Sequence, residues 1–222
     1  TALYNQWILS LAESGNYIFA GTYTGVFMST NNGHNWTQSS LNNVKVFSIS
    51  IIGNNVFAGT ENYPSGTGGV WLSTNNGQNW ALTSLNNITV LSFSVTGNDI
   101  YAGTRYDNAT TGGVWLSTNN GQNWTQTSLK NRDINSLFVI GNTVLAGSLD
   151  YNNSGMWRSI DKGQNWTQTS TIPAYTFDIS GNNIYAASNF GVFLSTNDGQ
   201  SWTNIGLNNN YYVTSLAVSG SN

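Results

Sequence analysis

One eight-residue sequence recurs along the chain and constrains the fold more than any other feature. Ser73-Thr74-Asn75-Asn76-Gly77-Gln78-Asn79-Trp80 returns unchanged at residues 117–124. Variants of it end at Trp36, Trp166 and Trp202, so the five tryptophans are 44, 44, 42 and 36 residues apart. Five copies at a nearly constant spacing predict one structural unit that is used five times.

Each repeat has the pattern of four short β-strands. The first strand alternates apolar and small residues, as in Phe47-Ser48-Ile49-Ser50-Ile51, and the turn Gly53-Asn54 follows it. In the same repeat the second strand is 56–60, the third is Val70-Trp71-Leu72, and the fourth starts at the tryptophan of the repeated motif. No segment has helical periodicity. We therefore expect an all-β fold, a β-propeller of four-stranded antiparallel blades.

Five complete blades and one extra strand account for the chain as a single propeller domain over residues 1–222. The blades are expected at about 7–40, 44–84, 88–128, 132–170 and 174–204. The extra strand, 211–220, resembles residues 6–15, which form the first strand of blade one. Three arrangements are open for it: pairing within blade one, pairing with another chain in a homo-oligomer, or opening a further blade of a longer protein.

The pattern Ser-x-Asp/Asn-x-Gly-x-x-Trp resembles the Asp-box (BNR) repeat of sialidases, Vps10/sortilin propellers, Ycf48-type assembly factors and xyloglucan-degrading hydrolases. The acidic position is Asn in four copies, and only Asp161 keeps the acid. The short Asx side chain accepts backbone N–H bonds within a turn, glycine supplies the left-handed residue, and the tryptophan packs between sheets. The resemblance implies an outer turn away from the ligand face. These structural residues are Asn31, Gly33, Trp36, Asn75, Gly77, Trp80, Asn119, Gly121, Trp124, Asp161, Gly163, Trp166, Asn197, Gly199 and Trp202.

Composition excludes several classes of function. Only 7% of residues are charged and the net charge is −3, so no basic surface exists for a nucleic acid. No apolar run approaches the ~20 residues of a membrane span. The absence of cysteine excludes disulfides and thiolate metal sites. A surface rich in Asn and Thr, with few charges and no cysteine, favours a secreted or cell-surface protein of a bacterium.

Catalysis is the less favoured reading of the sequence, and no catalytic residue is assigned. Sialidases use an arginine triad and an Arg-Ile-Pro motif, and neither is present among the three arginines of this chain. A glycosidase needs two carboxylates roughly 5.5 Å or 6.5–9.5 Å apart. Glu61, Asp107 and Asp150 share equivalent loops and are the candidates for that alternative, although solvated loop charges are the simpler interpretation. We expect no cofactor and no metal, because there is one histidine, His34, and Asn replaces most box carboxylates.

The loops between the second and third strands are the expected ligand face. Every one of them carries an aromatic residue, and propeller geometry places them beside the connections from the fourth strand to the next blade. Rings edged by amides and charges suit a glycan, and Tyr and Arg equally suit a protein partner. The rings alternatively serve to pack each loop onto its blade. The candidate ligand-binding residues are Tyr23, Glu61, Tyr63, Arg105, Tyr106, Asp107, Asp150, Tyr151 and Phe190.

Overall fold

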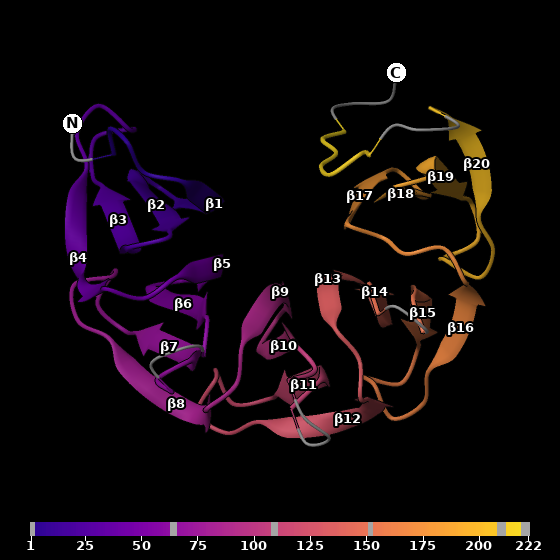
Figure 1. Ribbon diagram of the computed structural model, residues 1–222, viewed down its shortest axis with the longest axis horizontal. Coiled ribbons are helices and arrows are strands. Elements are labelled where there is room, and N and C mark those ends of the chain that lie inside the picture. The colour runs from indigo at the N-terminus through magenta and orange to yellow at the C-terminus, as the bar shows by residue number, and fades with distance from the viewer. Residues whose placement is uncertain (1–2, 63–65, 108–110, 151–152, 208–211, 219–222) are drawn as a thin grey trace. The chain divides into compact units, whose positions relative to one another are not determined.

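The structure is a computed structural model that describes residues 3–62, 66–107, 111–150, 153–207 and 212–218. It contains five sheets of four strands, and in each sheet the strands follow one another in chain order (Figure 1). The structure thus confirms the all-β prediction and the five blades. The chain divides into two compact units, which we call unit one (1–100 and 117–124) and unit two (101–116 and 125–222).

The first two blades and the first strand of the third lie in unit one. Their strands are β1 (Ile8–Ser14), β2 (Tyr17–Thr22), β3 (Gly25–Ser29), β4 (Thr37–Asn42), β5 (Val46–Ile52), β6 (Asn55–Thr60), β7 (Gly69–Ser73), β8 (Ala81–Asn86) and β9 (Val90–Thr96). First strands of successive blades lie side by side, β1 beside β5 and β5 beside β9. The fourth strand begins one residue after the box tryptophan rather than at it.

The later strands complete blade three and form blades four and five. They are β10 (Asp99–Thr104), β11 (Gly113–Ser117), β12 (Thr125–Lys130), β13 (Ile134–Ile140), β14 (Thr143–Ser148), β15 (Gly155–Ser159), β16 (Thr167–Ser170), β17 (Thr176–Ser180), β18 (Asn183–Ser188), β19 (Gly191–Ser195) and β20 (Thr203–Gly206). Within unit two, β13 lies beside β17.

The prediction of an extra strand over 211–220 differs from the structure. The described part of that segment, residues 212–218, forms no strand. It is held against blade five by two backbone N–H groups. That of Val213 donates to the carbonyl of Ser188 at 3.1 Å, and that of Val218 donates to Asp178 Oδ2 at 2.6 Å. One of these bonds goes to a side chain, so the segment does not make the regular backbone ladder that a strand requires.

The hydrophobic core lies between successive blades. One cluster in unit one joins Phe19 and Leu41 of blade one to Val46 and Val56 of blade two, with Trp80 packed against it. Two clusters in unit two join blade three to blade four and blade four to blade five, and each also receives a box tryptophan. The period-2 pattern of the strands therefore buries its apolar face against the next sheet.

The repeated motif forms the turn between the third and fourth strands. In blade two Ser73 Oγ donates to Asn75 Oδ1, and the backbone N–H groups of Gly77 and Asn79 donate to Ser73 Oγ and Asn75 Oδ1, all at 2.9 Å. The same three bonds recur in the other four blades. The side-chain oxygens of the central Ser-x-Asx pair thus serve the backbone of their own turn.

Two successive residues of each motif, rather than the glycine alone, have positive φ. In blade two these are Asn76 at 53° and Gly77 at 77°. Asn accepts the left-handed region more readily than most residues, which explains its use at this position. At the position of Asn76, blade four has Lys162, with φ of 58°. The other four blades have the short polar residues Asn or Asp at this position.

Candidate binding face

An aromatic pair with a cation beside it lies at the loop between β2 and β3. The rings of Trp7 and Tyr23 meet edge to face with centroids 5.6 Å apart, and the two residues are 73% and 46% exposed. The ammonium of Lys45 lies 4.5 Å from the centroid of Tyr23 and 3.7 Å from Glu61 Oε1. Two accessible rings and one ion pair thus share a surface of unit one, which we call the Trp7 platform (Trp7, Tyr23, Lys45 and Glu61).

Backbone and amide bonds hold the Trp7 platform in place. The N–H of Glu61 donates to the carbonyl of Lys45 at 2.9 Å, which fixes both charged residues relative to blade two. Beside Tyr23, the hydroxyl of Thr24 donates to Gln6 Oε1 at 2.7 Å. Gln38 Nε2 donates to the carbonyl of Thr24 at 2.9 Å. The loop is therefore anchored on both sides without using the aromatic rings, and both Trp7 and Tyr23 remain exposed beside Lys45.

A second cluster forms in unit two around two aspartates. The N–H of Tyr106, in the loop after β10, donates to Asp133 Oδ1, and the N–H of Asp133 donates to Asp150 Oδ1 at 2.8 Å. Asp133 precedes the first strand of blade four, whereas Asp150 follows its second strand. The connection between β12 and β13 thus contacts two loops, the one after β10 in blade three and the one after β14 in blade four. This agrees with the expectation that the two kinds of loop share a face.

Arg132 lies on an aromatic ring next to these aspartates. Its guanidinium carbon is 4.1 Å from the ring centroid of Trp157, and Nη1 donates to the carbonyl of Asn153 at 2.9 Å. Burial lowers the pKa of Arg132, and the negative charge of Asp150 opposes that effect. A guanidinium that lies over a ring in this way keeps its charge, because the contact with the ring is favourable to the cation. We call Arg132, Asp133, Asp150 and Trp157 the Asp150 cluster.

Asp150 is the carboxylate whose surroundings are most unusual. Burial raises its pKa, the N–H bond from Asp133 lowers it, the charge of Asp133 raises it, and the charge of Arg132 lowers it. Its Oδ2 is buried and has no hydrogen-bond partner among the described residues. A carboxyl group with this environment favours the protonated form more than an exposed aspartate does.

The remaining candidate residues are spread over both units. Phe190, between β18 and β19, is exposed, as is Asp107, whose N–H donates to Thr111 Oγ1 at 3.1 Å. Arg105 is half-buried directly after β10. Tyr63 and Tyr151 lie outside the described residues. The structure therefore brings Tyr23 together with Glu61, and Tyr106 together with Asp150, while Asp107 joins neither group in the described contacts.

Five residues of these clusters are not among the candidates predicted from the sequence: Trp7, Lys45, Arg132, Asp133 and Trp157. Trp7 and Lys45 each directly precede a first strand, and Trp157 lies within β15. The position before the first strand holds Asp133 in blade four, and both Lys45 and Asp133 contact the second-to-third-strand loop of the preceding blade, one through a ring and the other through a backbone N–H. Trp157 belongs to a third-strand pattern that reads as core, so nothing in the sequence marked it.

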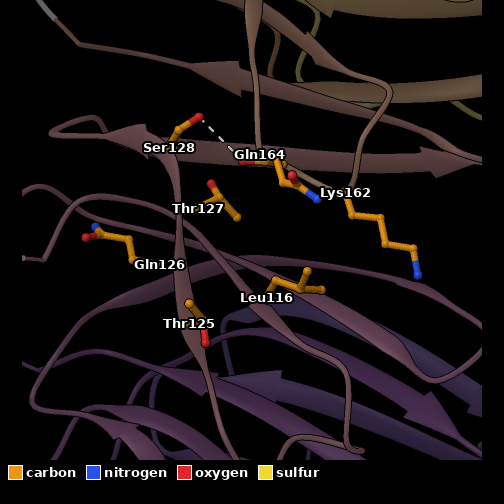
Figure 2. A pocket seen from close by; sticks show the side chains of 8 residues that line it. Leu116, Thr125, Gln126, Thr127, Ser128, Lys162 and Gln164 are labelled. Carbon is orange, nitrogen blue, oxygen red and sulfur yellow. Dashed lines mark hydrogen bonds between the residues drawn. The ribbon is translucent and has the colours of Figure 1, made fainter.

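The box side of unit two has a small pocket of about 220 Å³ between β12 and the turn of blade four. Figure 2 shows Leu116 and the β12 residues around it, with Lys162 and Gln164 from the turn. Here Ser128 Oγ and N–H both donate to the carbonyl of Gly163. In the two earlier junctions the acceptor is a glutamine in the box turn of the next blade. Ser40 of β4 donates to the carbonyl of Gln78, and Ser84 of β8 donates to the carbonyl of Gln122. The acceptor in the turn of blade four is therefore one motif position earlier than in the other two junctions. The pocket lies at this altered junction.

The described residues contain no group of three or more side chains suited to a metal ion. His34 is exposed, and its Nδ1 lies 2.7 Å from the carbonyl oxygen of Asn31 in the same turn. Within the described part of the chain, no helix has the length and apolar character that a membrane crossing would need.

Comparison with known proteins defines the fold. No profile of a known protein family matches the chain, and no curated protein matches it by sequence. Among solved structures, an ancestral GH74 enzyme is 25% identical with a TM-score of 0.73, over 91% of this chain and 32% of that one. Ycf48 bound to a D1 peptide is 14% identical with a TM-score of 0.68, over 94% of this chain and 72% of that one.

The extracellular domain of BT4673 from B. thetaiotaomicron is also similar. It is 18% identical with a TM-score of 0.67, over 89% of this chain and 27% of that one. The chain therefore spans about a third of the GH74 enzyme and about a quarter of the BT4673 domain that it matches. All three have β-propeller folds, and the fold of this chain is that of a β-propeller.

Proposed function

We propose that the chain is a non-catalytic binding module of the cell exterior that recognises a glycan through its loop face. The Trp7 platform is the observation that carries this proposal. Trp7 and Tyr23 expose large ring surfaces, and Lys45 and Glu61 stand beside them with polar atoms that can bond hydroxyl groups. Aromatic rings stack on the apolar faces of sugars, while a few placed polar groups fix the orientation.

An extracellular setting is supported by composition and by one structural relative. Few charges, no cysteine and many amide and hydroxyl side chains suit a surface in an oxidising environment. The BT4673 relative is itself an extracellular domain. A protein ligand fits the same surface, since tyrosine and tryptophan are common interface anchors, and Ycf48 is seen bound to a peptide. We favour a glycan because the charged residues of the platform are already paired with each other.

Glycan binding by wild type, Trp7→Ala and Tyr23→Ala tests the proposal. We expect each substitution to weaken binding by at least about tenfold, equal to about 1.4 kcal/mol, because each removes one stacking surface. Ile160→Ala is the matched control, since Ile160 is 61% exposed and lies in a box turn. Binding that is unchanged in both aromatic variants contradicts the proposal. A protein ligand captured only by wild type, with no glycan bound, favours the protein alternative.

A hydrolase is the second candidate, and the Asp150 cluster is the observation that favours it. A raised pKa on Asp150 is what a general acid needs, and Asp133 is the neighbouring carboxylate. This pairing replaces the set expected from sequence, since Glu61 forms an ion pair with Lys45 and Asp107 is solvated. Turnover of a bound glycan by wild type that Asp150→Asn abolishes supports this candidate. Identical rates in both proteins, or no turnover, remove it.

A further inference from the structure

Three of the repeated motifs contain an asparagine directly followed by glycine. The pairs are Asn32-Gly33, Asn76-Gly77 and Asn120-Gly121. In such a pair the backbone nitrogen of glycine can attack the side-chain carbon Cγ of asparagine, because glycine has no β-carbon to hinder the approach. The asparagine is half-exposed in blade two and exposed in blade three, so water reaches it. These pairs are therefore chemical sites for deamidation, the reaction that makes asparagine a labile residue.

Deamidation proceeds through a cyclic imide and needs only water. A bond forms between the glycine nitrogen and Cγ of asparagine, the glycine nitrogen loses its proton to solvent, and the side-chain nitrogen takes up a proton and leaves as ammonia. Water then opens the imide at one of its two carbonyl carbons. One product is aspartate, and the other is isoaspartate, in which the main chain runs through the side-chain carbons. The reaction thus needs a glycine nitrogen that can lose its proton and can reach Cγ.

The glycine N–H is bonded to a buried serine in blades two and three. Gly77 donates to Ser73 Oγ and Gly121 donates to Ser117 Oγ, at 2.9 Å in both turns. Each serine hydroxyl donates in turn to the asparagine Oδ1 two positions later, at 2.9 Å in blade two and 3.0 Å in blade three. Both serines and both glycines are buried. The proton that the glycine nitrogen would have to lose is therefore held away from solvent.

The backbone of the asparagine also holds the two reacting atoms apart. Its φ is 53° at Asn76 and 55° at Asn120. In this left-handed region ψ is about +47°, which places the nitrogen of the next residue across the Cα–C bond from Cβ. Ring closure requires that nitrogen and Cβ to lie on the same side of the bond. The turn must therefore open before the glycine nitrogen can attack.

Packing between blades opposes that opening. A β-carbon on Gly77 would lie 2.5 Å from Cε1 of Phe19, and one on Gly121 would lie 2.4 Å from Cε1 of Phe57. Both phenylalanines are fully buried, and all four residues belong to unit one. Because the glycine backbone lies against a buried ring, rotation of the Asn-Gly segment requires that ring to move.

Blade five shows which of the two products the turn accepts. Asp198 stands at the position of Asn76, with φ of 55°, and the N–H of Gly199 donates to Ser195 Oγ at 2.9 Å. Aspartate therefore fits the turn without loss of its hydrogen bonds. Isoaspartate lengthens the main chain between the serine and the glycine, so it is incompatible with bonds that span two to four residues.

From these observations we infer that Asn76-Gly77 and Asn120-Gly121 are deamidation sites that the folded turn keeps closed, and that Ser73 and Ser117 are the residues that close them. Each serine bonds the attacking nitrogen and, through the same oxygen, fixes the asparagine two positions later. The serine of the motif thus protects the chain chemically in addition to shaping its turn. This inference does not depend on the ligand of the loop face, so it stands or falls separately from the proposed function.

Ser73→Ala tests the inference, and the identical sequence at 117–124 is its control within the same molecule. Folded protein is kept at mildly alkaline pH, and peptide mass spectrometry follows conversion at each asparagine. Peptides that extend to Ala81 or Thr125 distinguish the two sites. In wild type, we expect both sites to convert at least about tenfold more slowly than in urea-unfolded chain, because the turn must first open. In Ser73→Ala, conversion at Asn76 should rise at least about threefold through loss of the hydrogen bond, with Asn120 unchanged.

Ser117→Ala is the mirrored variant and should accelerate conversion at Asn120 alone. Circular dichroism establishes that each variant is folded during the incubation. Wild type that converts as fast when folded as when unfolded overturns the protection by the turn. An unchanged rate at Asn76 in Ser73→Ala overturns the role of the serine. Equal acceleration at both asparagines in either variant also overturns it, because that result comes from unfolding of the whole chain rather than from one turn.

Discussion

Gly77 of blade two lies against the ring of Phe19 in blade one, with no room for a side chain between them. A β-carbon at Gly77 would be 2.5 Å from Cε1 of Phe19, and φ is 77°. We expect Gly77→Ala to cost about 1–2 kcal/mol from the backbone and about 1–3 kcal/mol more from overpacking. Urea unfolding of the purified variant measures the sum.

Gly33→Ala is the matched comparison for this effect. Gly33 has nearly the same φ, 82°, but its nearest neighbours are 3.8 Å and 3.9 Å away. It should therefore show the backbone cost alone. Equal losses in the free energy of unfolding for the two variants would show that the close contact with Phe19 contributes nothing to stability.

Local chemistry made the fold predictable from the sequence. The box turn uses bonds between residues two to four positions apart, and each blade repeats the same spacing, so the motif identifies the turn and its flanking strands. The platform depends instead on contacts between blades. Lys45 reaches Tyr23 across 22 positions, and its role follows from the placement of two loops that no local pattern encodes. The segment after β20 resembles a first strand, yet its described residues bond to blade five through one carbonyl and one side chain rather than through a backbone ladder.

The candidate residues of unit two also depend on contacts that the sequence does not predict. Asp150 is recognisable in the sequence as a loop acid, but its raised pKa comes from burial and from Asp133, which the chain brings to it from a different loop. Arg132 is one of four polar residues in a connection, and its stacking on Trp157 depends on a third-strand side chain. The sequence therefore identifies the polar residues at these positions, but it does not predict which residues they contact.

Asp150 should make the protein more stable as the pH falls from neutrality. Its folded pKa is raised above 3.8, so the folded state binds more protons than the unfolded state between those two values. Stability should rise as the pH falls through the folded pKa and gain nothing further from this group below 3.8. The difference between wild type and Asp150→Asn in urea midpoint isolates this effect, because other carboxylates cancel. Parallel pH profiles for the two proteins would contradict the prediction.

Asp161 should have the opposite pH dependence. The N–H and side-chain amide of Asn165 and the hydroxyl of Ser159 donate to its carboxylate and lower its pKa. Its stabilising contribution is therefore present above 3.8 and is lost as the pH falls through the folded pKa. Asp161→Asn gives the turn the residue that the other four blades use. Wild type should lose its advantage over this variant in acid, and an advantage that persists there would contradict the assignment.

Trp202 is the one box tryptophan in the described residues whose indole bonds to the preceding blade. Its Nε1–H donates to Thr169 Oγ1 at 3.1 Å, whereas the other four donate to the glycine carbonyl of their own turn. A double-mutant cycle of Trp202→Phe and Thr169→Val should therefore give a coupling of about 0.5–1.5 kcal/mol in the free energy of unfolding. Trp80→Phe combined with Thr169→Val is the control, because these residues belong to different units, and it should show additive losses. Additivity in both pairs would mean that this hydrogen bond does not tie blade five to blade four.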